Sequence, residues 1–116
     1  MRYRVVAVGR MKDAALRAAC DEYLDRLRHY AKVEEREVKD EARVLGAIPE
    51  GTRLVALSRR GEECTSAELA EWTARWELEG RDVALAIGGA AALPDDVLQR
   101  AEKVWSLSRL TFPHEL

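Results

Sequence analysis

The chain has 116 residues, of which 34% are charged and 47% hydrophobic, and its formal net charge is −2. A chain of this length can form one domain with a sizeable core and needs no disulfide or metal to hold it. The nearly neutral charge argues against a protein that finds free nucleic acid through a general basic field.

Hydrophobic periodicity predicts strands and helices that alternate along the chain. Strands are expected where short β-branched or alternating runs occur, over residues 3–8, 33–38, 53–58, 82–87 and 104–108. Helices are expected where apolar residues recur at helical spacing, over residues 12–30, 41–47, 65–80 and 93–103. The helix over 12–30 should bury one face. The helix over 65–80 should begin with a capping box of Thr65 and Glu68 and end at Gly80.

This order of elements predicts an α/β fold with a mostly parallel sheet, right-handed crossovers and helices on both faces. Residues 82–87 are apolar almost throughout, so we expect them to form a central strand covered on both sides. Nothing in the sequence indicates a linker or a repeat. We therefore expect residues 1–116 to form a single domain.

Ligands of open parallel sheets bind beyond the carboxyl ends of the strands. Three segments follow strands in this way, at residues 57–61, 88–92 and 106–114. The Gly88-Gly89 pair lets main chain approach a ligand, although a tight strand-to-helix turn explains it equally simply. Arg59 and Arg60 share the predicted turn at residues 59–63 and form a local basic patch, although such pairs are more often only solvated.

Several other kinds of chemistry lack support in the sequence. The sequence has no Ser-His-Asp arrangement of the kind that forms a catalytic triad, no pair of carboxylates at predicted strand ends and no cluster of metal ligands. Cys20 and Cys64 form no C-x-x-C motif and fit a reducing compartment. No window approaches about 18 apolar residues. We therefore predict a cytoplasmic protein with neither a metal nor a membrane segment, and we expect His29, on a helix surface, to have no role.

Five segments resemble the RlmH family, small SPOUT-class methyltransferases of bacteria. They are VAVGRMKD, EYLDRLRHYAKVEEREV, LVALSRRG, WELEGRDVALAIGGA and WSLSRLTFPHEL. The specific signal is IGG followed by L-S-x-[LM]-T-[FL]-P-H, and the resemblance extends from Arg2 to Leu116. It implies a homodimer with a trefoil knot that uses S-adenosyl-L-methionine to methylate N3 of a pseudouridine in large-subunit ribosomal RNA on the ribosome.

The resemblance also implies where the cofactor binds. Carried over residue by residue, the family's cofactor contacts fall on Leu57, Gly88, Leu107, Ser108, Arg109, Leu110, Thr111 and Phe112. These positions lie in the same three segments that follow strands. Apolar side chains and loop amides suit an adenine ring, and a sulfonium donor needs no metal. The catalytic residue is unknown; His114 is a candidate base, with a structural role as the alternative.

Two departures from the family pattern affect these expectations. Ala91 and Ala92 stand where members usually have an acid and a glycine. Members also continue past the Pro-His motif with an arginine-bearing helix and a Tyr-His-Arg ending. We therefore expect an incomplete knot in residues 1–116, cofactor affinity lower by at least about tenfold, or about 1.4 kcal/mol, than with such a tail, and no detectable methylation of ribosomes.

Two further hypotheses follow from the same residues. The chain could be a binding or dimerisation module on the SPOUT sheet that has lost turnover, whereas an unrelated nucleotide-binding domain is disfavoured by the C-terminal motif. Trp72 and Trp76 lie four residues apart on one helix face. We expect the dimer surface to form around this helix and the last strand, with plain core packing as the alternative.

Overall fold

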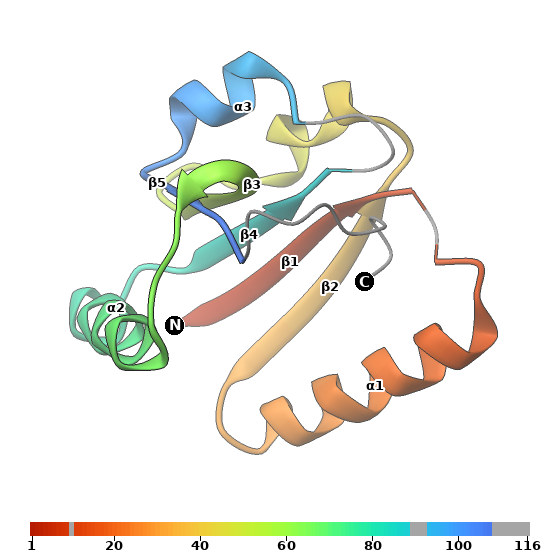
Figure 1. Cartoon of the computed structure of the whole chain (residues 1–116), viewed down its shortest axis with the longest axis horizontal. Helices are drawn as coiled ribbons and strands as arrows, with labels where there is room; N and C mark the ends of the chain where they lie inside the picture. Colours follow the sequence, from red (N-terminus) through yellow and green to blue (C-terminus); the bar gives the residue numbers. More distant parts are fainter. Residues whose placement is uncertain (10, 89–92, 108–116) are drawn as a thin grey trace.

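The computed structural model describes residues 1–9, 11–88 and 93–107 and is built around one five-stranded sheet. Its strands are β1 (Arg2–Val8), β2 (Lys32–Val38), β3 (Arg53–Glu62), β4 (Val83–Ile87) and β5 (Lys103–Trp105). The connecting helices are α1 (Ala14–Arg28), the 3-10 helices η1 (Glu41–Arg43) and η2 (Leu45–Ala47), α2 (Ser66–Glu79) and α3 (Asp95–Arg100). The strand order is β2-β1-β4-β3-β5, with every neighbouring pair parallel (Figure 1). The predicted α/β fold is confirmed.

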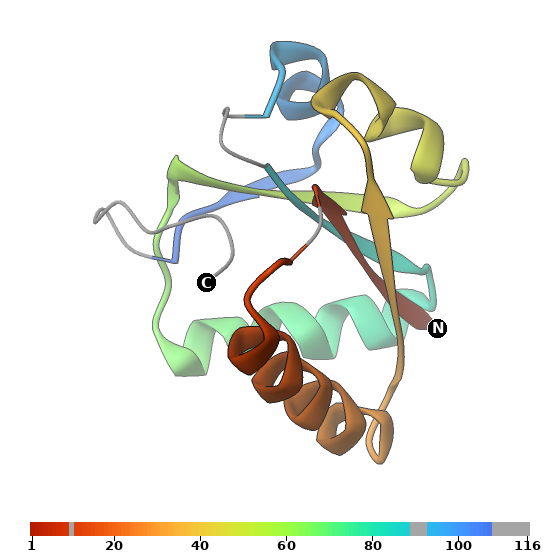
Figure 2. The same cartoon turned by 90° about the vertical axis from the view of Figure 1, so that its right-hand side faces the viewer.

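Helices cover both faces of the sheet, as Figure 2 shows, with α1 and α2 on one side and α3 with the 3-10 helices on the other. Alternate residues of each strand point to opposite faces and so supply two cores. The cluster on the α3 side contains Val6, Val8, Val44, Ala47, Ile48, Leu54, Ala56, Ala84, Ala86, Leu93 and Val97. The cluster on the α2 side contains Val55, Trp72, Trp76 and Val83. As predicted, β4 lies at the centre of the sheet and contributes to both.

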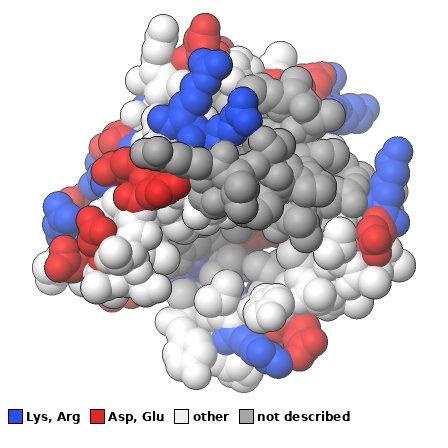
Figure 3. Space-filling model, viewed as in Figure 1, with Lys and Arg blue, Asp and Glu red and all other residues white. Residues whose placement is uncertain are grey.

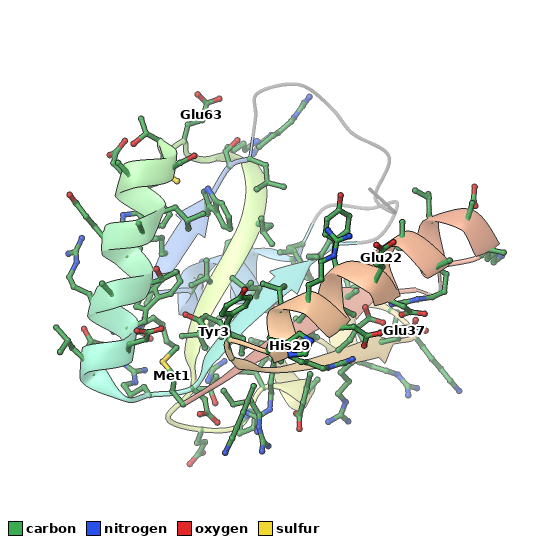
Figure 4. All side chains as sticks on the ribbon, turned by 90° about the horizontal axis from the view of Figure 1, so that it is seen from below. Met1, Tyr3, Glu22, His29, Glu37 and Glu63 are labelled. Atoms are coloured by element: carbon green, nitrogen blue, oxygen red, sulfur yellow. The ribbon has the colours of Figure 1, made fainter. Side chains whose placement is uncertain are left out.

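The tryptophans of α2 point into the protein rather than outward. Trp72 and Trp76 are only 6% and 5% exposed. The Trp72 ring centroid lies 6.1 Å from that of Trp105 in an edge-on arrangement. Met1 and Tyr3 pack against the same cluster, between α2 and the sheet (Figure 4). The two rings are therefore core residues, covered by β5 and the start of the chain, as the alternative of plain core packing has it. A dimer surface around α2 and the last strand stays a prediction.

Helix α1 lies at the margin of the fold and buries none of its residues. Its N-cap is Asp13, whose carboxylate accepts hydrogen bonds from the N–H groups of Ala15 and Leu16 at 2.9 and 3.1 Å. The helix packs on the edge strand β2, and Tyr23 and Leu27 remain 64% and 50% exposed. The predicted buried face is only partly formed. Leu16, Cys20 and Leu24 are half-buried, whereas Tyr23 and Leu27 stay exposed because β2, at the edge of the sheet, does not cover them.

The remaining elements match the prediction in kind but differ in extent. The Thr65 and Glu68 capping box is present, and Gly80 ends α2 with φ of 72°. Strand β3 continues to Glu62, so the turn predicted at residues 59–63 lies largely within the strand. Helix α3 is shorter than predicted.

The knot expected from the resemblance involves residues 108–116, outside the described residues, and stays a prediction. No helix in the described ranges is long and apolar enough to cross a membrane.

Ion pairs hold together the edge of the sheet where the strands begin. The Asp82 carboxylate accepts hydrogen bonds from the Arg2 N–H at 2.9 Å and from Arg4 Nη1 at 3.0 Å, which joins β1 to β4. Arg81 binds both carboxylate oxygens of Glu102, at 3.0 and 2.8 Å. Burial raises the pKa of Asp82, but the hydrogen bonds from Arg2 and Arg4 outweigh burial and place it below its ordinary value of 3.8.

We expect Asp82→Asn to lower the free energy of unfolding by about 1 kcal/mol at neutral pH, because an amide makes weaker hydrogen bonds with the two arginines. Since the folded-state pKa is depressed, this stabilisation is present above about pH 4 and is lost as the pH falls through the folded-state pKa. Urea unfolding at neutral and acid pH measures the difference. The control Asp25→Asn removes a carboxylate that is 75% exposed. An equal loss in both variants would contradict a special role for Asp82.

Candidate functional site

The carboxyl ends of β3 and β4 lie side by side. Ala56 of β3 pairs with Ala86 of β4. Because the strands are parallel, Leu57 comes next to Ile87, and Gly88 follows immediately. Leu57 and Gly88 are both partly buried. Two of the three segments predicted to bind a ligand are therefore adjacent in the structure.

The carboxyl end of β5 lies on the other side of β3. Leu57 pairs with Trp105, and Leu107 follows two residues later. Leu107 is 65% exposed. The third predicted segment thus begins beside the first, and Leu57 occupies the middle position between the ends of β4 and β5.

After Leu57, strand β3 loses its pairing with β5 over residues 58–61 and then pairs again with the same residue, Trp105. Both Leu57 and Glu62 pair with Trp105, so residues 58–61 form a bulge. The return depends on Gly61, because a Cβ atom there would lie 2.5 Å from the carbonyl oxygen of Val104 and 2.8 Å from the Trp105 nitrogen. The Ser106 N–H then donates to the Glu62 carbonyl oxygen at 2.9 Å. A glycine thus lets two backbones touch and fixes the bulge onto β5.

Side chains hold the same junction from the α2 face. Lys103 donates from Nζ to the Glu62 carboxylate at 3.0 Å. Its ammonium group also lies 3.7 Å from the Trp72 ring centroid, within cation–π range. Although β5 has only three residues, it is attached to both β3 and α2. The strand ends that carry Leu57 and Leu107 are therefore firmly positioned relative to each other.

The chemistry at this edge of the sheet suits a flat ligand with polar ends. Leu57 and Leu107 supply apolar contacts, and the main chain that ends each strand supplies hydrogen-bonding groups. Within the described residues, no group of three His, Cys, Asp or Glu side chains could hold a metal ion. His29 caps the far end of α1, well separated from Glu63, which follows β3 (Figure 4). It therefore lies away from the edge that the strand ends form.

The structure places only part of the predicted site. It brings together Leu57, Gly88 and Leu107. The other candidates lie outside the described residues and stay predictions: Ser108, Arg109, Leu110, Thr111, Phe112 and His114, with Ala91 and Ala92 of the neighbouring loop. Sequence reasoning missed Gly61 and Lys103. A glycine next to a predicted strand was the available signal for Gly61, but it also fits an ordinary turn.

Comparisons with known proteins agree along the whole chain. A family model described as "Predicted SPOUT methyltransferase" matches residues 1–116. A protein of Sorangium cellulosum named ribosomal RNA large subunit methyltransferase H is 45% identical, over 100% of this chain and 84% of that protein. Proteins of the same name are 42% identical in Pelotomaculum thermopropionicum, over 97% of this chain and 82% of theirs, and 39% identical in Gloeobacter violaceus, over 100% and 84%.

We expect Gly61→Ala to destabilise the protein by about 1–3 kcal/mol, because the new Cβ atom forces the backbones of β3 and β5 apart. Urea unfolding measures the loss, and tryptophan fluorescence reports on Trp72 and Trp105 near the junction. Gly46→Ala is the matched control, since no atom lies within 4 Å of a Cβ added there. A Gly61→Ala variant as stable as the control would show that the close approach is not needed.

Proposed function

The chain belongs to the SPOUT methyltransferase family, and on that premise we propose that it transfers a methyl group from S-adenosyl-L-methionine to N3 of a pseudouridine in large-subunit ribosomal RNA. The enzyme class follows from the family: the chain is an RNA methyltransferase, related to proteins named for that activity. The observation that supports the cofactor site best is the register that places Leu57 between Gly88 and the residues that follow Trp105.

The described residues fit S-adenosyl-L-methionine in their chemistry. Leu57 and Leu107 offer apolar contacts to an adenine ring, while Gly88 lets main chain come close to a ribose or a carboxylate. The remaining proposed contacts come from Ser108, Arg109, Leu110, Thr111 and Phe112. We treat residues 1–116 as one methyltransferase domain, since the family model spans all of them.

The cofactor, when bound, supplies a methyl group already activated on a sulfonium sulfur. The N3 atom of the base would take up that methyl group and give up its proton, and Leu57, Gly88 and Leu107 would hold the cofactor beside it. The protein's task is therefore to align the N3 atom with the methyl carbon and to accept or release that proton. The strand ends do the aligning by fixing Leu57 and Leu107. His114 is our candidate for the proton acceptor.

The ribosome is the proposed partner, and the cytoplasm, where ribosomes are found, is the proposed location. A net charge of −2 gives the chain no general attraction for RNA, so a shaped surface of the large subunit must contribute to binding. We further propose a homodimer. The exposed side chains of Tyr23 and Leu27 on α1 support it, because a second copy would cover apolar surface that these described side chains expose. Sedimentation that shows only monomer at micromolar concentration would contradict it.

One alternative is a protein with the same fold but without methyl-transfer activity. The chain has Ala91 and Ala92 where the family pattern usually has an acid and a glycine. This difference favours a binding or dimerisation module without turnover. Such a module would retain the paired ends of β3, β4 and β5 and would bind a partner without transferring a methyl group. Methyl transfer therefore separates the two hypotheses directly.

Transfer of a tritiated methyl group to undermethylated large subunits tests the proposal, with mass spectrometry to identify the modified nucleoside. We expect a single pseudouridine to be labelled, at N3. Labelling of another nucleoside would contradict the proposed substrate. Cofactor binding without any labelling would favour the binding module.

We expect Gly88→Val to abolish binding of S-adenosyl-L-methionine while the fold is kept, because a β-branched side chain would keep the ligand away from the main chain. Titration calorimetry measures the affinity, and circular dichroism checks the fold. Gly46→Val, on the 3-10 helix η2 where no atom lies within 4 Å of an added Cβ, is the control and should bind as the unchanged chain does. Unchanged affinity in Gly88→Val would remove Gly88 from the site.

A further inference from the structure

Building on the proposed function, we propose that Arg59 and Arg60, on the bulge of β3, bind the phosphate backbone of the RNA substrate beside the cofactor site. The two arginines stand at the middle of residues 58–61, the part of β3 that leaves the sheet. Both are exposed. In the view of Figure 3, Lys and Arg side chains lie near the end of β3 in Figure 1, with Asp and Glu side chains beside them.

The bulge holds the two arginines in a defined place. Its base is closed by the contact between Gly61 and the Val104 carbonyl group, which leaves no room for a side chain. Its first residue, Ser58, accepts a hydrogen bond at Oγ from the Arg60 N–H at 3.2 Å. The Ser58 hydrogen bond thus lies within the bulge, and the Gly61 contact holds the end of the bulge against β5. A ligand held by these arginines would lie beside the proposed cofactor contacts.

The charge around the bulge leaves Arg60 available for an outside anion. The nearest acidic residue of β3, Glu62, is bound by Lys103 at 3.0 Å. Within the described ranges, Arg60 forms no ion pair, whereas Arg2, Arg4 and Arg81 are each held by a carboxylate of the chain itself. The ion-paired arginines lie where strands begin and fasten the sheet. The arginines of the bulge lie at the opposite edge, where the substrate must approach.

Phosphate is the anion that best fits this arrangement. A guanidinium group presents its donors as a planar fork that matches phosphate oxygens, and it stays charged at any physiological pH. One or two such contacts fix the register of an RNA without reading its sequence. They suit a protein whose overall charge is −2, because they provide local attraction where a general basic field is missing.

The test compares the double variant Arg59→Gln/Arg60→Gln with the control Arg36→Gln/Arg75→Gln. The control makes the same change in net charge at two exposed arginines outside the bulge, Arg36 of β2 and Arg75 of α2. Strand β2 is separated from β3 by β1 and β4. Binding to undermethylated large subunits is measured over a range of salt concentrations, and binding of S-adenosyl-L-methionine is measured separately. Neither pair contributes to the proposed cofactor contacts.

We expect the bulge variant to bind large subunits about tenfold more weakly at low salt and to keep its cofactor affinity. The slope of log affinity against log salt concentration should become shallower by an amount that corresponds to the loss of about one to two phosphate contacts. The control should behave as the unchanged chain. Equal losses in both variants would overturn the inference and leave the proposed function standing. A loss of cofactor affinity in the bulge variant would also overturn it, since the arginines would then hold the cofactor. If the unchanged chain does not bind large subunits at all, both proposals fail.

Discussion

The candidate site depends on the close contact between β3 and β5 at Gly61. A strand of three residues at the edge of a sheet would be weakly held by pairing alone. Here the backbone of Gly61 lies against that of Val104, and the chain beyond it closes a hydrogen bond to Ser106. That contact closes the bulge, whose two flanking residues, Leu57 and Glu62, both pair with Trp105, and residues 106 and 107 follow directly. Cofactor contacts and RNA contacts would both be organised by it.

The two edges of the sheet differ in the groups that they present. Where the strands begin, arginines are paired with Asp82, Glu102 and Glu34, so charges there neutralise one another and join neighbouring strands. Where the strands end, the described residues offer leucine side chains, main-chain groups and the exposed Arg60. This arrangement matches the general behaviour of parallel sheets, whose ligands bind beyond the carboxyl ends of the strands.

Much of the fold was predictable because local signals and tertiary packing agree. The apolar run of β4 required cover on both faces, and Thr65, Glu68 and Gly80 fixed the limits of α2. The failures occur where tertiary context decides. Periodicity marks one side of α1 as apolar but cannot tell that an edge strand leaves Tyr23 and Leu27 exposed. Two tryptophans on one helix face are compatible with a core as well as with an interface. Gly61 was predicted to lie in a turn because the backbone that it contacts is distant in sequence. The site positions came from a family pattern, which periodicity alone cannot supply.

The central claim is that the ligand of this methyltransferase binds at the carboxyl edge of the sheet, across the ends of β4, β3 and β5. A titration of the ¹⁵N-labelled chain with S-adenosyl-L-methionine, followed through its amide resonances, tests it most directly and tolerates weak binding. The account predicts that the amides of Leu57, Gly88 and Leu107 shift together with one dissociation constant, while those of Arg53 and Asp82 at the opposite edge stay in place. Shifts centred on the opposite edge, or no shifts at a saturating concentration, would contradict it.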